Sequence, residues 1–521
     1  MTSLALFRQR HARETALASL CAILFLTFLD NTIVSVALAD VQTSLGSSVS
    51  GLQWIVDGYM LAFAALMLTG GTLGDLLGRK QVMLAGVAVF CAGSIVAALA
   101  HGTGVLIAGR IVMGVGAAAS EPGTLSLIRH IYPERRERAV ALGVWAAVSG
   151  LALALGPVLG GVLVAGPGWR WIFWFGLGFG AVALAVAAVT LTESRDPEGR
   201  KLDVPGLAAG AAAIVAATFA VIEGENRGYG TWWIVLLFAA AAALVVVFVL
   251  VERRVPDPVL KLEFLRNPTF AAANVVAFAT NLSVFSVFFF TALYLQLISN
   301  FSGNQIALVF TSLAVAMIVS GVAAGYWTAR VGPKVPMVAG CALAGLGLLL
   351  VDRELTATTS IAALAWPLAI AGLGFGIALV TMTAAVLTLV PQEQSGMAAS
   401  TVNTSRELGG VFGVAVLGAV VNAQLTSGLS EKLVRLGIPE VYRQVVIRFV
   451  TTGGNITSAE NSPGVKGHEK LIAKVLLAAE GSAGHGVHLA LRIAGAIVLA
   501  AAVVAAFAAR HRVVRVEEAE V

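Results

Sequence analysis

The sequence predicts an all-α membrane protein that crosses the bilayer many times. Of its 521 residues, 58% are hydrophobic and only 12% are charged, whereas a soluble domain carries about a quarter charged residues. The apolar residues gather in runs of about 20, the length that an α-helix needs to cross the hydrocarbon core. Basic residues gather in alternate loops between these runs. These three observations exclude a soluble globule and indicate a polytopic membrane protein.

The apolar runs define the spanning elements in chain order. The first run contains Asp30 and is long enough to span, so we interpret it as a membrane helix rather than a cleaved signal peptide. The remaining runs follow at similar spacing and predict fourteen spans in all. They are placed at 15–37, 52–73, 82–100, 104–128, 139–164, 171–191, 204–222, 231–251, 269–297, 304–329, 335–351, 359–388, 396–423 and 487–509.

The loop charges orient these spans. Arginine and lysine crowd every second loop, whereas the short loops between them carry only Arg170, Arg227 and Arg353. By the positive-inside rule, both termini and the basic loops are cytoplasmic. The segment 424–486 is long enough to escape this rule. Its amphipathic stretches at 440–450 and 468–479 predict a small extracellular cap.

A polar turn between the second and third spans is the most distinctive loop. It reads Gly71-Thr-Leu-Gly-Asp75-Leu-Leu-Gly78-Arg79-Lys80. Gly71 and Gly78 allow two helix ends to approach closely. We expect Asp75 to accept hydrogen bonds from backbone donors at a neighbouring helix N-terminus, and Arg79 and Lys80 to hold this edge at the cytoplasmic face. The turn therefore predicts a latch between helices.

The latch segment occurs twice in the chain. Residues 325–334 match it at Gly71, Gly78 and Lys80, all at one offset of about 254 residues, but they lack the aspartate. The last six spans thus repeat the first six. We predict an N-terminal six-helix bundle at 1–192, a linker with two inserted helices at 193–266, and a C-terminal six-helix bundle at 267–521 that includes the segment 424–486. Two facing bundles place a substrate site at their interface near the midplane.

Further motifs support one family. Residues 29–38 are similar to a first-span motif, and Arg110–Gly116 to a fourth-span motif with an intramembrane arginine, although Met113 stands where glutamine is common. The latch segment matches the same family's signature, with Leu76 in place of an arginine. Together these motifs resemble the major facilitator superfamily, and specifically its fourteen-span drug:proton antiporters of the QacA and EmrB type.

The fifth span carries a glycine–proline segment. Pro157 removes a backbone donor, while Gly156, Gly160 and Gly161 allow another helix to pack closely, which predicts a kinked and mobile contact. The segment resembles the family's fifth-span motif associated with antiporters, with Ala152 in place of its leading glycine.

The resemblance implies a function. It implies a secondary transporter of the plasma (inner) membrane that exports hydrophobic, cationic compounds in exchange for protons by alternating access, and so confers antibiotic resistance. Its partners would be small-molecule substrates, protons and the bilayer, with no nucleic acid, and it would act as a monomer. The segment 424–486 is a candidate docking surface for an extracellular partner. Two alternatives stay open: an exporter of one metabolite, lipid or self-made antibiotic, and a non-transporting sensor.

Neither an enzyme nor a cofactor protein is expected. The sequence contains no G-x-x-x-x-G-K-[ST] phosphate loop, so the proton gradient rather than ATP would drive transport. No histidine falls in the interior of a predicted span, which leaves no intramembrane Ser/His/Asp constellation. Cys21, Cys91 and Cys341 all lie inside apolar runs and predict packing residues rather than a metal site.

Ionisable residues inside spans are costly and point to function. Asp30, Asp57 and Arg110 lie roughly 8–11 Å below the outer surface at 1.5 Å per residue, so they are expected to face one cavity. Burial favours a protonated carboxylate and a nearby arginine favours the charged form, so proton affinity changes as a cavity opens. Asp30 is the first candidate for proton coupling. The alternatives are a structural Asp30–Arg110 pair and a helix-start role for Asp57.

Two further intramembrane groups complete the candidate site. Glu121 precedes Pro122 on the fourth span and lies closer to the cytoplasm, where it would receive a cationic substrate or relay a proton. Arg406 and Glu407 are neighbours in the thirteenth span, where we predict a local structural pair in the C-terminal half.

Overall fold

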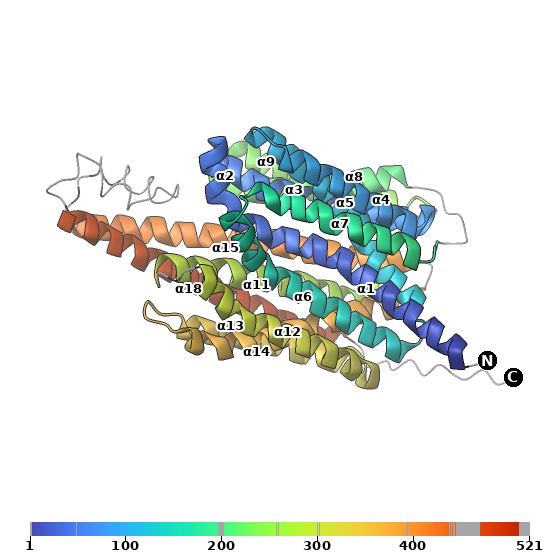
Figure 1. Ribbon diagram of the computed structural model, residues 1–521. Coiled ribbons are helices and arrows are strands. Elements are labelled where there is room, and N and C mark those ends of the chain that lie inside the picture. The colour runs from blue at the N-terminus through green and yellow to red at the C-terminus, as the bar shows by residue number, and fades with distance from the viewer. Residues whose placement is uncertain are drawn as a thin grey trace.

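The protein is almost entirely helical. The computed structural model describes residues 3–47, 49–195, 203–256, 258, 260–299, 301, 303–391, 394–436, 438, 440, 443 and 469–509, and these include no β-strand (Figure 1). Thirteen helices in this described part of the chain are long and apolar enough to cross a membrane. A further helix, α6 (Arg135–Ala165), contains a shorter apolar stretch at Val140–Leu153. Each of the fourteen predicted spans lies on one of these helices.

Among the described residues, six long helices precede a pair of helices in the chain and six follow it, and we refer to the two sets of six as the first and second halves. The first half consists of α1 (Ser3–Ile33), α3 (Val49–Leu77), α4 (Arg79–Ala98), α5 (Thr103–Ile131), α6 and α7 (Arg170–Thr190). The inserted pair is α8 (Val204–Arg227) and α9 (Trp232–Glu252). The second half consists of α11 (Pro268–Leu297), α12 (Gly303–Val331), α13 (Lys334–Glu354), α14 (Ile361–Thr388), α15 (Ser395–Arg435) and α18 (Glu469–Ala508). Three short elements are η1 (Val34–Ala37), α2 (Leu38–Leu45) and α10 (Leu262–Arg266).

The two halves face each other along two helix pairs. The helix α6 packs on α12, and α3 packs on α15, whereas the most extensive contacts within each half are α4 with α5 and α12 with α14. Figure 1 shows the long helices lying roughly side by side. The interface between the halves therefore runs through the middle of the protein.

Glycines lie at close contacts between helices, and their positions in the two halves correspond through the repeat. A Cβ added at Gly86 on α4 would lie 2.6 Å from the carbonyl oxygen of Gly116 on α5. A Cβ added at Gly340 on α13 would lie 2.7 Å from the backbone nitrogen of Ala378 on α14. Gly86 and Gly340 are separated by the offset of about 254 residues that relates the two latch segments. Without a large hydrophobic driving force between helices in lipid, such close backbone packing is a main source of helix association.

The inserted pair lies against both halves. The helix α8 contacts α3 and α15, and α9 packs mainly on α8. Only 11% of the apolar window of α9 is buried, which is the exposure expected of a helix that faces lipid.

The structure describes mainly the two ends of the segment 424–486, for which a small extracellular cap is predicted. Residues 424–435 continue α15, and residues 469–486 form the first part of α18, so two spanning helices simply extend beyond the bundle (Figure 1). Leu429 and Leu433 are buried between them. The predicted amphipathic stretch at 440–450 lies mostly outside the described residues. At these two ends, helix hydrogen bonding continues without a break past the apolar run.

The close α4–α5 packing makes a stability prediction. We expect Gly86→Ala to lower the thermal unfolding temperature of the detergent-solubilised protein, because overpacking costs roughly 1–3 kcal/mol. Gly178→Ala is the matched control, since a Cβ at Gly178 on α7 meets nothing within 4 Å. The unfolding temperature of Gly178→Ala should differ from that of wild type by no more than an ordinary surface substitution causes. Equal shifts in both variants, measured by fluorescence-detected size exclusion after heating, would contradict the packing argument.

Candidate functional site

The latch turn lies at the basic end of the bundle, which we define as the end that holds Lys80, Arg129 and Lys334. Gly78 joins α3 to α4 with φ of +119°, a backbone conformation that residues with a Cβ rarely adopt. The glycine thus allows the sharp reversal that brings the polar residues of the turn together.

Asp75 ties the two halves together. Its Oδ2 accepts the backbone N–H of Met397, in the first turn of α15, at 3.0 Å. Its Oδ1 pairs with the guanidinium of Arg79 at 2.8 Å. Both side chains are buried. A carboxylate at a helix N-terminus is stabilised by the orphan N–H groups and by the helix dipole, so the hydrogen bond expected from the sequence is present and joins opposite halves.

Further contacts close the basic end. Arg79 Nη1 donates to Ser194 Oγ at 2.9 Å, and Lys80 Nζ donates to the Leu191 carbonyl at 2.7 Å. These bonds anchor the turn within the first half. Arg129, at the end of α5, donates to the Val390 carbonyl of the second half at 2.7 Å. The contacts of Asp75 and Arg129 across the interface therefore hold the basic end shut in this conformation.

Asp30 and Arg110 form a buried pair within the first half. Arg110 Nη1 donates to Asp30 Oδ2, and Arg110 Nε donates to the Ile55 carbonyl at 2.9 Å. The guanidinium also lies 4.4 Å from the ring centroid of Tyr59, a distance at which a cation is attracted to the ring face. One carboxylate thus faces one guanidinium. Asp57 is a partly exposed residue of α3.

A second charge cluster lies between the halves. Glu121 on α5 is 3.8 Å from Arg406 on α15, measured from Oε1 to Nη1, and Glu407 interacts electrostatically with both. None of the three is more than 1% exposed. The cluster brings together Glu121 and the Arg406–Glu407 pair, two candidate groups of the sequence analysis that lie far apart in the chain. Arg406 therefore interacts with a residue of the opposite half as well as with its neighbour on α15.

Aromatic side chains hold the arginine of this cluster. The Arg406 guanidinium lies 5.1 Å from the ring centroid of Phe28 and 5.3 Å from that of Trp145. Its Nη1 donates to Asn403 Oδ1 at 3.0 Å. The indole of Trp145 donates in turn to Thr124 Oγ1 at 3.1 Å. Trp145 and Asn403 were not predicted as site residues, and only their place beside an intramembrane arginine would have singled them out.

A small cavity adjoins the cluster and is lined by both halves. Phe28 and Ser149 line it from the first half, and Asn281 and Phe375 from the second, with Arg406 among the lining residues. Asn281 Nδ2 donates to the backbone carbonyl of Arg406 at 3.0 Å. The lining is mostly apolar with a few placed polar groups, which is the usual make-up of a small-molecule site.

The cluster holds more acceptors than its neighbours satisfy. Among the described residues, neither carboxylate oxygen of Glu121 has a hydrogen-bond partner, nor does Oε2 of Glu407. Buried polar groups are nearly always hydrogen-bonded, so such exceptions need an explanation. Two carboxylates beside one guanidinium carry one negative charge in excess when all three are ionised. The excess charge marks the place where a proton or a cation would be stabilised.

The glycine–proline segment of α6 packs against the first span. A Cβ at Gly160 would lie 2.8 Å from the Ile33 carbonyl oxygen, and Gly156 abuts Thr32 even more closely, whereas a Cβ at Gly161 would meet nothing within 4 Å. The side chain of Pro157 lies outside the described part of the structure. The segment thus places α6, which also contacts α12 of the second half, directly on the helix that carries Asp30.

The sequence model of the Major Facilitator Superfamily matches residues 20–414. The chain belongs to this superfamily. The multidrug resistance protein Stp of Mycobacterium tuberculosis is 32% identical to it over 83% of this chain and 80% of the relative. The methylenomycin A resistance protein of Streptomyces coelicolor is 34% identical over 76% and 83% of the two chains. The tetracenomycin C resistance and export protein of Streptomyces glaucescens is 29% identical over 92% and 88%.

A solved structure shares the fold. The human organic anion transporter MFSD10 superposes with a TM-score of 0.58 at 17% identity, over 79% of this chain and 93% of the other. The family and the fold make the chain a multi-span membrane transporter and not an enzyme.

The Asp75 contact makes a testable prediction about the superfamily latch. Asp75→Ala leaves the Met397 N–H and the Arg79 guanidinium without this carboxylate, and a hydrogen bond to a charged group is worth about 1.5–3 kcal/mol. We therefore expect roughly a tenfold gain in the conformation open at the basic end. The measurement is the rate of maleimide labelling of Ser400→Cys, a fully buried position one turn beyond Met397. Labelling should accelerate in Asp75→Ala and stay unchanged in Asp40→Ala, which removes an exposed carboxylate from α2.

Proposed function

We propose that this transporter exports hydrophobic, cationic compounds across the plasma membrane in exchange for protons. The basic end would face the cytoplasm, with both termini, since basic loops are retained on that side. The names of the relatives support a drug or antibiotic exporter. The two halves would rock about the central site to give alternating access.

The observation that carries the proposal is the charge imbalance between the halves. Glu121 lies 3.8 Å from the Arg406 guanidinium, and Glu407 interacts electrostatically with it, in an interior that water does not reach. An uncompensated charge is expensive there, so the second carboxylate needs either a bound proton or a cationic ligand. The two occupants exclude each other. A cation that enters would release the proton, and a proton that returns would release the cation, which is the exchange an antiporter performs.

The remaining predicted residues fit this proposal as supporting parts. Asp30 stays a candidate for proton coupling, and Tyr59 lies within electrostatic reach of Asp30, Arg110 and both glutamates. Opening of the basic end would break the Asp75 contact, and the α6 segment at Gly156 and Gly160 would slide on α1. Asp57 is proposed as an outer contact for the same charge network.

A proton is sufficient as the driving ion. One charge that moves across 100 mV releases about 2.3 kcal/mol, and 1.4 kcal/mol corresponds to a factor of ten. One proton per cycle would thus support roughly fortyfold accumulation. No cofactor is proposed beyond the gradient.

A dedicated exporter is the second candidate. Two of the relatives are named for resistance to a single antibiotic and one for multidrug resistance, so the names are compatible with one substrate or many. The small volume beside Arg406 favours neither. In a dedicated exporter that acts as a monomer, the segment 424–486 would serve as a docking surface for an extracellular partner. A non-transporting sensor would need no charge imbalance in its centre.

Efflux of ethidium separates these candidates. In inverted vesicles energised with a proton gradient, wild type should accumulate the dye, a protonophore should abolish accumulation, and Glu121→Gln and Glu407→Gln should each reduce it at least tenfold while inserted normally. Asp30→Asn is measured in parallel. Glu431→Gln is the matched control, because Glu431 is an exposed glutamate on the same helix as Glu407. If wild type moves no dye under a verified gradient, the proposal of broad cation export is wrong. Transport of single antibiotics would then be measured, because a dedicated exporter should move one of them and a sensor should move none.

Proton release on binding tests the exchange itself. Addition of tetraphenylphosphonium to the purified protein in weakly buffered solution should release about one proton per bound cation, because both compete for one negative charge. Cation affinity should therefore fall as pH falls, by up to about tenfold per pH unit while the site is protonated. Glu121→Gln or Glu407→Gln should abolish the release. Equal proton release in wild type and both variants would place the exchange elsewhere, with Asp30 as the next site to test.

A further inference from the structure

The guanidinium of Arg406 lies over two aromatic rings that both belong to the opposite half. Its central carbon is 5.1 Å from the ring centroid of Phe28 on α1 and 5.3 Å from that of Trp145 on α6. Each of these two residues is 1% exposed. At such distances a ring face attracts a cation, and the attraction is strongest where water is excluded. We refer to Phe28 and Trp145 as the aromatic pair.

The orientation of the Trp145 ring does not depend on Arg406. The indole N–H donates to Thr124 Oγ1 at 3.1 Å, and the Thr124 hydroxyl donates to the backbone carbonyl of Glu121 at 2.6 Å. Both bonds lie within the first half, between α6 and α5. The ring therefore keeps its position when the second half, which carries Arg406, moves away.

Arg406 has few directional contacts in this position. Its Nη1 donates to Asn403 Oδ1 on the same helix, and its Nε has no hydrogen-bond partner among the described residues. The distance of 3.8 Å from Nη1 to Glu121 Oε1 is too long for a hydrogen bond. Within the described structure, ring faces and charge rather than hydrogen bonds thus connect the guanidinium to the first half.

An organic cation that lacks N–H groups is bound by the same kinds of contact. Quaternary ammonium and phosphonium ions cannot donate hydrogen bonds, and aromatic faces are a common way to recognise them. The first half offers such an ion two rings and the carboxylate of Glu121. The cavity that Phe28 and Arg406 help to line adjoins these groups. The first half therefore contains the parts of a cation site, and in this conformation Arg406 occupies it.

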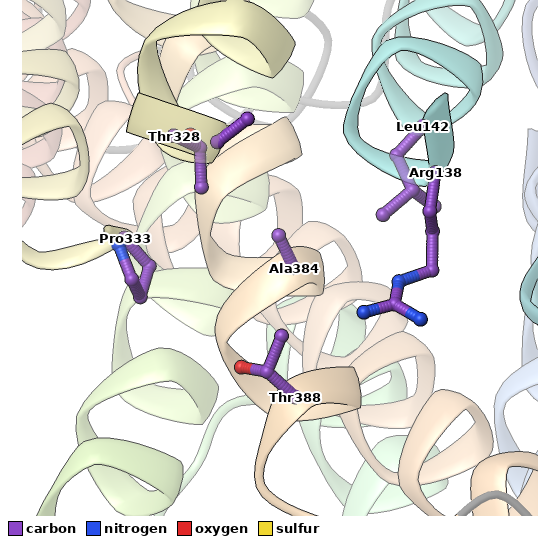
Figure 2. Close-up of a pocket in the computed structure, with 7 residues that line it drawn as sticks. Arg138, Leu142, Thr328, Pro333, Ala384 and Thr388 are labelled. Carbon is purple, nitrogen blue, oxygen red and sulfur yellow. The ribbon is translucent and has the colours of Figure 1, made fainter. Parts of the chain in front are cut away.

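Other arginines in the described part of the chain lack this arrangement. Arg110, Arg170 and Arg227 each lie over one ring. Arg138 faces a second cavity, at the basic end, where its side chain extends from α6 toward α14 (Figure 2). None of the described residues that line this second cavity is aromatic; besides Arg138 they are Leu142, Thr328, Ala329, Pro333, Ala384 and Thr388. The combination of an arginine, two rings and a cavity is thus found at the centre.

We propose that Phe28 and Trp145 determine specificity for lipophilic cations without N–H groups, and that Arg406 is an internal occupant which such a cation displaces from the two rings. The inference rests on the proposed export of cations. Arg406 would stay beside Glu407 on its own helix, while the substrate takes the aromatic pair and Glu121. The loaded site would then hold two cations and two carboxylates, which need no proton to balance their charge.

A charge-matched double substitution tests the displacement. Arg406→Gln combined with Glu407→Gln removes one positive and one negative charge, so the cluster keeps its net charge while the aromatic pair becomes vacant. Tetraphenylphosphonium should bind this double variant roughly tenfold more tightly than wild type, because no internal cation competes for the rings. Isothermal titration calorimetry of the detergent-purified proteins measures the difference. Equal or weaker binding by the folded double variant would overturn the displacement.

The rings are tested in the same double variant. Phe28→Leu and Trp145→Leu should each lower the affinity for tetraphenylphosphonium roughly tenfold, since each removes one ring face. Phe28→trifluorophenylalanine keeps a ring but withdraws electron density from its face, so it should also weaken binding. Phe90→Leu is the matched control and should bind as its parent does, because Phe90 is an equally buried ring on α4, which packs mainly within the first half. Unchanged binding by the fluorinated variant would overturn the role of the ring face.

Photolabelling tests the site in the wild-type protein, so it does not depend on the folding of any variant. An azide derivative of tetraphenylphosphonium should label the peptides of α1 and α6 that carry Phe28 and Trp145, and excess tetraphenylphosphonium should prevent the labelling. Labelling confined to other peptides, with normal binding and proton release, would overturn this inference alone. The absence of any binding to wild type would overturn the proposed cation export and this inference together.

Discussion

The central constraint on this structure is the presence of two carboxylates and one guanidinium in an interior that water does not reach. Glu121 comes from one half and Arg406 with Glu407 from the other, so Glu121 lies beside the guanidinium only while the halves are together. A static protein would replace such a cluster with apolar side chains at little cost in stability. A transporter that must bind and release charge has a physical reason to keep it.

The Asp30–Arg110 pair and the Glu121 cluster differ in this respect. Asp30 and Arg110 are matched one to one within the first half, and the arginine is further held by the Ile55 carbonyl and by the ring of Tyr59. The Glu121 cluster is unmatched and spans the interface. A pair that stays within one half need not change when the halves rock, whereas a cluster across the interface must. This difference is why the geometry draws attention from Asp30 toward the glutamates, although the role of each group stays a prediction.

The basic end shows how a repeated sequence is used unequally. The first latch joins the halves through the carboxylate of Asp75 and the N-terminus of α15, with Arg129 as a second connection. The second latch has lost its aspartate, and Ala329, which stands at that position, lines the small cavity at the basic end. The inserted pair adds to this difference, because α8 covers the α3–α15 side.

The sequence by itself determined the membrane class and the approximate positions of the thirteen long apolar helices among the described residues. These properties depend on local hydrophobicity and on the fixed length needed to cross a bilayer, both of which can be read along the chain. The Asp75 contact could also be anticipated, since few partners suit a carboxylate at a helix end. Only the tertiary structure decided which intramembrane charges meet, because Glu121 and Arg406 lie hundreds of residues apart and nothing in their local sequence records the pairing. It likewise decided that residues 424–435 and 469–486 extend α15 and α18, since polar residues on a helix mark where the membrane ends but not where the helix ends.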